Sequence, residues 1–223
     1  MVFMADSEWA AEIVRERGID AGLHLNFTTA FTAPGRAARL TEQQQRLSRY
    51  LRRHRFAPAL FHPGLVRSFE YVVAAQRDEF CRLYGAEPAR VDGHHHMHLS
   101  ANVLCQGLLP RGVLVRRNFS FQPGEKSLVN RLYRRAVDRS LAKRYRLADF
   151  LFSLTPFEPR ARLQRILSLA HRFVVEVETH PVREEEYQFL MGDEVGRWIG
   201  NFPIAPRFSV TPRSSAAAQG EHE

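Results

Sequence analysis

The segment "ARVDGHHHMH", residues 89–98, decides how the rest of the chain is interpreted. Residues 89–93 form a short, partly apolar run that predicts a strand, and this strand leads directly into a cluster of histidines. Residues 66–84 before it have the apolar spacing of a helix, which Gly85 closes. Residues 101–109 after it predict a second helix, and the β-branched run 112–116 predicts a second strand. This alternation of strands and helices predicts a parallel α/β sheet or barrel.

The same alternation extends over most of the chain. Further helices are predicted at 6–17, 41–55, 128–147 and 159–172, and further strands at 20–28 and 173–181. The last ordered element is predicted to include residues 184–199. The first of these helices is expected to bury Trp9, Ile13 and Val14. The helix at 128–147 is expected to bury Leu128, Leu132, Val137, Leu141 and Tyr145. Residues 1–205 are therefore predicted to form one α/β domain, and the polar, small-residue stretch 206–223 a disordered tail.

Composition fits a globular chain in a reducing compartment. The chain has 223 residues, of which 44% are hydrophobic, and this is enough for one substantial core. It contains no apolar run long enough to predict a membrane span, and residues 1–10 lack the features of a secretory signal. The two cysteines, Cys81 and Cys105, are too few for a disulfide framework. We therefore expect a cytoplasmic location.

Positive charge is concentrated in the segment 116–146. The net charge is +8, and this segment alone holds ten basic residues against Glu125 and Asp138. A basic stretch of this kind can bind nucleic acid, an anionic membrane surface or an acidic partner. The alternative interpretation is a solvated helix face without a binding role.

The histidine cluster favours a metal or catalytic site. If residues 92–98 are extended, a period of two places Asp92, His94, His96 and His98 on one face and leaves His95 and Met97 on the other. Neutral imidazoles suit divalent transition metals, and a neighbouring carboxylate can orient a ring through its second nitrogen. The alternative is a chance histidine-rich surface loop.

Two further histidines lie at predicted strand ends. Taken alone, His24 and His180 would each be interpreted as structural residues. Glu176 and Glu178 share a strand face with His180, either as acid partners or as charges on a solvated strand end. Because α/β proteins build their sites at the carboxyl ends of strands, these histidines and the cluster are expected to meet.

The segments "GLHLNFT" (22–28), "VDGHHHMH" (91–98) and "VETHP" (177–181) together resemble the YdjC-like carbohydrate deacetylases. That family includes chito-oligosaccharide deacetylases and hopanoid-biosynthesis-associated proteins. The resemblance covers residues 2–198 and is weakest around 118–150. It implies a distorted (β/α) barrel of the polysaccharide-deacetylase type. It also implies a metal-dependent hydrolase that cleaves an amide C–N bond, removing acetyl from an N-acetylated sugar or oligosaccharide.

The resemblance also implies roles for individual residues. His24 and His94 would bind a divalent metal, magnesium in the first place and zinc as the alternative. His180 and Asp92 would be catalytic, with His180 on general-acid or oxyanion duty. His96, His98 and Arg116 would face the substrate. The expected partner is an acetylated amino sugar, and a homo-oligomer is compatible with the sequence, whereas nucleic acid and a membrane span are not expected.

One motif of the family is absent from this sequence. The family begins with a strand ending in Asn-Ala-Asp-Asp-Phe-Gly, which supplies a further metal ligand, and no such motif occurs here. We expect a barrel that lacks its first strand and helix, either through a misplaced start or because the member is degenerate. Such a chain should bind metal weakly and show no measurable deacetylase activity. The runner-up hypothesis is a non-catalytic member, or a binding protein that uses 116–146 for nucleic acid or anionic lipid.

Overall fold

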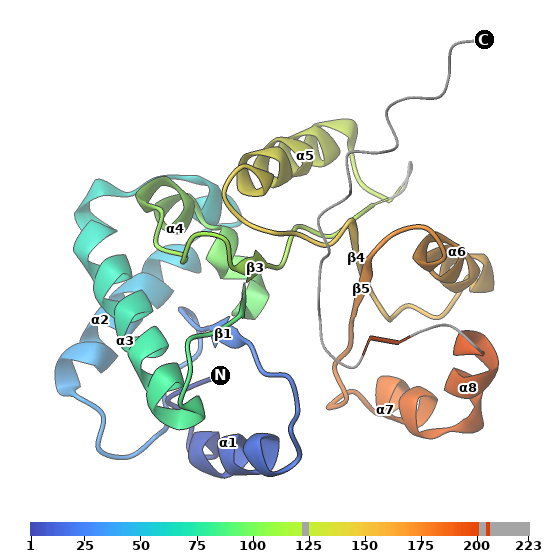
Figure 1. Ribbon diagram of the computed structural model, residues 1–223. Coiled ribbons are helices and arrows are strands. Elements are labelled where there is room, and N and C mark those ends of the chain that lie inside the picture. Colours follow the sequence, from blue (N-terminus) through green and yellow to red (C-terminus); the bar gives the residue numbers. More distant parts are fainter. Residues whose placement is uncertain (122–124, 201–203, 206–223) are drawn as a thin grey trace.

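Short apolar runs form parallel strands in this protein, and runs with helical periodicity form the helices between them. The computed structural model describes residues 1–121, 125–200 and 204–205, and Figure 1 shows the alternation along the chain. The predicted disordered tail, 206–223, lies outside the described residues.

The helices are α1 (Ser7–Glu16), α2 (Ala38–Leu51), α3 (Val66–Tyr84), α4 (Ala101–Gln106), α5 (Leu128–Ala142), α6 (Arg160–Ala170), α7 (Glu184–Met191) and α8 (Asp193–Ile199). The strands are β1 (Leu23–Leu25), β2 (Arg90–Gly93), β3 (Leu114–Val115), β4 (Phe150–Ser153) and β5 (Val175–Glu178). Three short 3-10 helices are η1 (Ala57–Ala59), η2 (Pro63–Leu65) and η3 (His94–Leu99).

The strands form two parallel sheets. One sheet has the order β1-β2-β3, with His24 opposite Asp92 in the register, and the other pairs β4 with β5. A parallel bridge from Leu114 to Arg146 connects the end of the first sheet to the segment before β4. The predicted parallel α/β architecture is confirmed. Among the described residues the strands do not close into a barrel, so the barrel itself stays a prediction.

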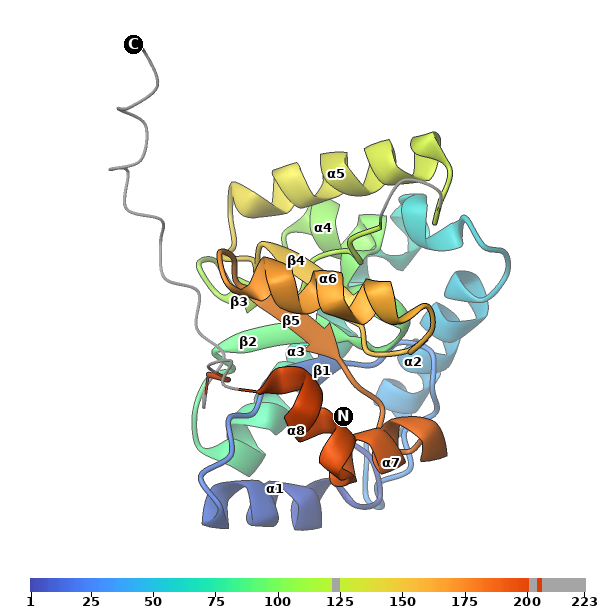
Figure 2. The same cartoon turned by 90° about the vertical axis from the view of Figure 1, so that its right-hand side faces the viewer.

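Helices cover both sheets, but the cores beneath them differ in size. The larger core contains Leu25, Phe27, Phe69 and Val91, all without exposed surface, and lies between the first sheet and helices α2 and α3. The smaller core is formed by buried side chains directly after β4 and on α6 and α7: Leu154, Leu163 and Phe189. Figure 2 shows α6 lying across the β4–β5 pair, and Figure 1 shows it on the opposite side of the molecule from α2 and α3.

The helix at 66–84 is confirmed with its predicted boundaries. Its predicted apolar residues are all buried, namely Phe69, Val72, Val73, Phe80 and Leu83. Gly85 ends the helix at a φ of 69°, a backbone conformation that glycine adopts without steric cost. The strand predicted at 89–93 is confirmed as β2, Arg90–Gly93.

Two predicted helix faces are only partly correct. Trp9 is 65% exposed, because α1 packs through Ala11, and residues two apart on a helix point about 200° apart. In α5, Leu128 and Leu132 are exposed while Leu141 is buried. The five-residue step from Leu132 to Val137 turns the helix about 140° away from the line that the first two leucines follow.

Candidate functional site

The predicted site residues lie together at the carboxyl ends of the strands. His24 and Asp92 occupy adjacent strands at the same level of the register, and the histidine cluster begins directly after β2. Arg116 follows β3, and His180 follows β5. The side chains face a cleft of about 1800 Å³ between the two sheets. The expectation that these histidines meet at the carboxyl ends of the strands is therefore confirmed, whereas their functional roles stay predictions.

The pair of His24 and Asp92 forms one side of the site. His24 Nδ1 lies 2.9 Å from Asp92 Oδ1, and the guanidinium of Arg116 lies 2.7 Å from the other carboxylate oxygen. Burial alone would raise the pKa of Asp92, but the hydrogen bond with His24 and the charges of His24 and Arg116 hold it well below its usual range. The carboxylate of Asp92 thereby orients the His24 ring, in the way that carboxylates orient metal-bound histidines.

Arg116 connects the two sheets through three carboxylates. Besides Asp92, its side chain reaches Glu176 Oε1 through Nε and Glu178 Oε1 through Nη1, each at 2.7 Å. Burial lowers the pKa of Arg116, but the carboxylates more than offset this and the pKa lies above its ordinary value. Burial raises the pKa of Glu176, and Arg116 opposes that rise. Interpreting Glu176 and Glu178 as charges on a solvated strand end is therefore wrong.

The histidine cluster is not extended, and the predicted alternation of its side chains is wrong. His94–Leu99 forms η3, in which His95 and His96 have φ values of 52° and 57°. Left-handed residues other than glycine are uncommon and gather at functional sites. The turn requires Gly93, where a Cβ would approach the backbone nitrogen and side chain of His98 to 3.0 Å.

The turn sends the four histidines to different places. The ring of His94 lies beside that of His24, with centroids 5.8 Å apart, and the ring of His95 contacts that of His94 at a tilt of 37°, with centroids 3.9 Å apart. His96 packs against Phe119 and lies 4.0 Å from a Glu178 oxygen. His98 has no exposed surface and donates from Nε2 to the backbone oxygen of Arg116 at 2.8 Å. His98 thus supports the turn from its buried side, and the substrate contact that the family resemblance implies for it stays a prediction.

Burial keeps three of these imidazoles neutral. It lowers the pKa of His94 to about 4, assisted by the charge of His95, and the pKa of His96 to about 3, assisted by the charge of His98. It also lowers the pKa of His98 to about 4, although the hydrogen bond to the Arg116 carbonyl opposes this. Near neutral pH these rings are therefore uncharged, and the uncharged imidazole is the form that can bind a metal or accept a proton.

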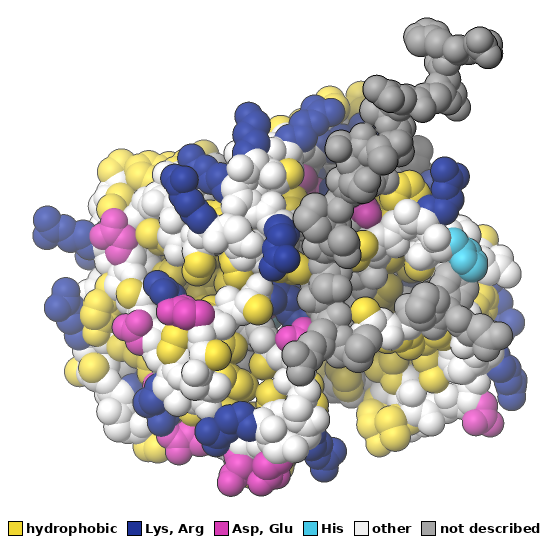
Figure 3. All heavy atoms as spheres, viewed as in Figure 1, with side chains coloured by type: hydrophobic (Ala, Val, Ile, Leu, Met, Phe, Trp, Pro, Cys, Tyr) yellow, Lys and Arg dark blue, Asp and Glu magenta, His cyan; other side chains and the backbone are white. Residues whose placement is uncertain are grey.

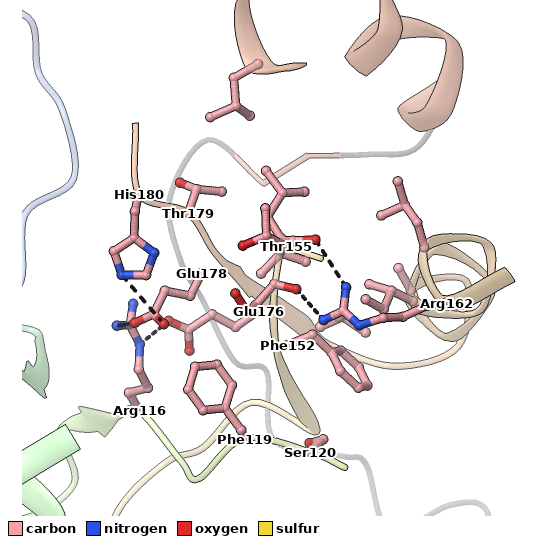
Figure 4. A pocket seen from close by; sticks show the side chains of 18 of the residues that line it. Arg116, Phe119, Ser120, Phe152, Thr155, Arg162, Glu176, Glu178, Thr179 and His180 are labelled. Atoms are coloured by element: carbon pink, nitrogen blue, oxygen red, sulfur yellow. Dashed lines mark hydrogen bonds and ion pairs between the residues drawn. The ribbon is translucent and has the colours of Figure 1, made fainter. Parts of the chain in front are cut away.

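A residue that sequence reasoning missed, Glu186, holds the loop of His180. Glu186 has no exposed surface and accepts hydrogen bonds from the His180 backbone N–H at 2.5 Å and the Thr155 hydroxyl at 2.9 Å. Figure 4 shows His180 pointing toward Glu178, and His180 Nε2 lies 3.9 Å from a Glu178 oxygen. The acidic run "REEEY" looks like helix surface, so only the fold reveals this anchor.

The cleft has a polar and an apolar part. The polar part contains the histidines and Arg116 with its carboxylates. The apolar part is lined by side chains on and around β4, α6 and α8, among them Phe119, Phe152, Leu163, Ile166 and Trp198. Figure 4 shows Arg116, Phe119, Glu178 and His180 gathered at one side, with Thr155 and Arg162 on the other. The arrangement can place a polar group at the histidines while aromatic and aliphatic surfaces contact the remainder of a ligand.

The side chains around His24 and His94 are of the types that bind the divalent metal implied by the family resemblance. Among the described residues, however, too few of them are grouped together. His24 and His94 are neighbouring imidazoles, and Asp92 orients the first of them as carboxylates orient metal-bound histidines. The Nδ1 atoms of His96 and His180 are buried without a hydrogen-bond partner in the described part of the chain. However, no group of three or more His, Cys, Asp or Glu side chains in that part is arranged to hold a metal. The predicted ligands His24 and His94 are therefore not joined by a third such side chain in a metal-binding arrangement within the described residues.

Comparison with known proteins decides the family. The family model described as YdjC-like protein matches residues 1–201. The chain belongs to the YdjC-like family. This family is associated with carbohydrate deacetylase-type function, and the match includes all the histidines discussed above. No curated protein and no solved structure shows a significant match. None of the helices in 1–121 and 125–200 combines the length and apolar character that crossing a membrane requires.

Proposed function

We propose that this YdjC-like protein carries the site of a carbohydrate deacetylase, a hydrolase that removes acetyl from an N-acetylated amino sugar. The observation that supports this most directly is the convergence of His24, Asp92, His94 and His180 at one edge of parallel strands. Three motifs that are distant in the sequence thereby supply imidazoles and a carboxylate to one cleft. We also propose that the two sheets are parts of a distorted (β/α) barrel of the polysaccharide-deacetylase type.

The reaction adds water to an amide, so that the C–N bond breaks and acetate and an amine are formed. A divalent cation, magnesium or zinc, would be bound by His24 and His94 and would polarise the acetyl carbonyl. Asp92 is a weak base because His24 and Arg116 hold its pKa well below the usual range, so we assign it to orienting His24. His180, from the opposite sheet, is positioned to donate a proton to the departing amine nitrogen.

Residues around these groups would bind the sugar. His96 and Phe119 form one wall, where a ring face can contact a pyranose. The guanidinium of Arg116 lies in the cleft wall, with Nε and Nη1 held by carboxylates. We therefore expect it to fix the position of Asp92 and Glu178, and any direct contact with the substrate to be secondary.

Binding and turnover are tested separately. Titration with N,N′-diacetylchitobiose, followed by NMR of the histidine ring protons, should perturb His94, His96 and His180. His94→Ala should weaken sugar or metal binding by roughly tenfold or more, while His54→Ala, at an exposed histidine outside the cleft, serves as the control. Absence of any perturbation at the cleft histidines would contradict the proposal.

Acetate release from the same sugar measures turnover. Because no three metal-binding side chains are grouped among the described residues, we expect weak binding of Mg²⁺ and Zn²⁺ and no measurable acetate from the 223-residue chain. Robust release that is abolished by a chelator would show that the metal site is complete, and would contradict this expectation while supporting the proposed function.

A further inference from the structure

Helix α5 exposes large aliphatic side chains to solvent. Val129 is 77% exposed, Leu128 65% and Leu132 53%, and they lie together in the first turns of the helix. The opposite side of α5 packs on the protein through Val137 and Leu141. Single exposed apolar residues are ordinary, but three neighbouring ones on the outer side of one helix are typical of a contact surface.

Basic side chains continue the same side of the helix. Positions 128, 132, 135 and 139 follow one another at steps of three or four residues, so Arg135 and Arg139 extend the line of the leucines. Both arginines are exposed, as is Lys143 in the turn that follows. By contrast, Arg117 is engaged by Asp138. Arg135, Arg139 and Lys143 thus face solvent, whereas Arg117 stabilises the fold through its ion pair with Asp138.

The position of α5 leaves this face accessible. Figures 1 and 2 both place α5 along the upper edge of the molecule, far from α1 at the lower edge. Figure 3 shows Lys and Arg side chains beside hydrophobic ones over this edge. We define the outer face of α5 as Leu128, Val129, Leu132, Arg135, Arg139 and Lys143.

We propose that the outer face of α5 docks on the surface of an anionic phospholipid bilayer. Arginine and lysine attract lipid phosphates, and the aliphatic side chains can enter the boundary between headgroups and acyl chains. Nucleic acid would use the basic residues but would leave Leu128, Val129 and Leu132 in water. A 15-residue helix that packs along its other side on the protein would lie on the membrane and not cross it.

Vesicle cosedimentation tests the proposal with two variants and a matched control. Vesicles of phosphatidylcholine alone are compared with vesicles that also contain phosphatidylglycerol. The wild-type chain should sediment with the anionic vesicles only. The double variants L128S/L132S and R135E/R139E should each weaken this binding by roughly tenfold or more. R15E/R17E makes the same change of charge at exposed arginines at the end of α1 and should leave binding within about twofold of wild type.

Three outcomes would overturn the proposal. One is that the wild type does not sediment with anionic vesicles at low salt. Another is that L128S/L132S binds as well as wild type while R135E/R139E loses both vesicle and duplex-DNA binding, because a purely electrostatic surface for polyanions would explain this. A third is a dimer in analytical ultracentrifugation that L128S/L132S dissociates, with no vesicle binding. Circular dichroism of each variant verifies that these surface substitutions leave the fold intact.

Discussion

Both sheets contribute residues to the site, but the two are stabilised in different ways. The β1–β3 sheet supplies His24, Asp92 and His94 and rests on the larger core around Phe69. The β4–β5 sheet supplies Glu178 and precedes His180, yet its core is the smaller cluster around Phe189. Arg116 connects the two through buried ion pairs. The part of the site on the β1–β3 sheet is therefore held mainly by packing of buried apolar side chains. The part on the β4–β5 sheet is held mainly by the ion pairs that Arg116 forms with carboxylates.

The largest expected change in the free energy of unfolding comes from removing a phenylalanine ring, and it should differ between the two cores. Phe69 has no exposed surface and packs on Phe27, with ring centroids 5.4 Å apart, so Phe69→Ala should lower the free energy of unfolding by about 4 kcal/mol. Phe189→Ala, in the smaller core, should cost about 2 kcal/mol because that region can relax around the change. Urea titrations measure both, and equal costs would contradict the comparison.

The next largest change in the free energy of unfolding is expected when Arg116, which connects the two sheets, is replaced. Arg116→Met leaves Asp92, Glu176 and Glu178 close together without their cation, which should cost about 3 kcal/mol at pH 7. In the wild type the folded pKa of Asp92 is lowered, so its contribution is present above the unfolded pKa and is lost as the pH falls.

In the variant, the crowded carboxylates gain protons more readily in the folded state, so the deficit relative to wild type should shrink toward pH 4. Unfolding of both proteins at pH 7 and pH 4 measures this, with Arg77→Met as a control at an exposed ion pair. A deficit that is independent of pH would argue against the ion cluster as its cause.

A third expected effect is that His98 makes the stability of the fold depend on pH. Its folded pKa of about 4 lies below the ordinary value of 6.5, so acid protonates the unfolded chain first. Stability should therefore decline as the pH falls from about 6.5 toward 4, by an amount on the order of 2 kcal/mol from this residue. His98→Gln retains a donor toward the Arg116 carbonyl and should flatten the decline. An unchanged pH profile in that variant would assign the effect to the other histidines.

The smallest effect is local to the loop of His180. Glu186→Gln replaces a buried carboxylate that accepts from the His180 N–H and the Thr155 hydroxyl, and should cost about 1 kcal/mol. Hydrogen exchange at His180 should accelerate while exchange in α3 stays unchanged. Glu185→Gln, at an exposed position on the same helix, is the control. Uniform acceleration throughout the chain would show that Glu186 stabilises the whole fold and not this loop.

Local patterns predicted much of the fold. The boundaries of α3 and the position of β2 follow from apolar spacing within one segment, and the closing glycine at 85 adds a local signal. The location of the site was also predictable, because parallel strands bring His24, the 94–98 cluster and His180 to one edge whatever the details of packing.

Features that depend on contacts between distant segments were not predictable. The sequence predicts an extended backbone for the histidine cluster. In the structure the backbone turns at His95 and His96, and the side chain of His98 reaches the carbonyl of Arg116. Glu186 looks like an ordinary surface acid until α7 folds back under His180. The outward direction of Leu128 and Leu132 likewise depends on which side of α5 meets the protein.

By itself, the sequence determined the parallel α/β alternation, the YdjC-like histidine motifs and the edge of the sheets where these motifs meet. Periodicity and motif spacing are properties of short segments, so they can be recognised without knowledge of the rest of the chain. Only the tertiary structure decided which histidines line the cleft, which carboxylates hold Arg116 and which face of α5 is exposed. Those outcomes depend on burial and on charge compensation between residues as far apart as His24 and Asp92, and no single segment encodes them.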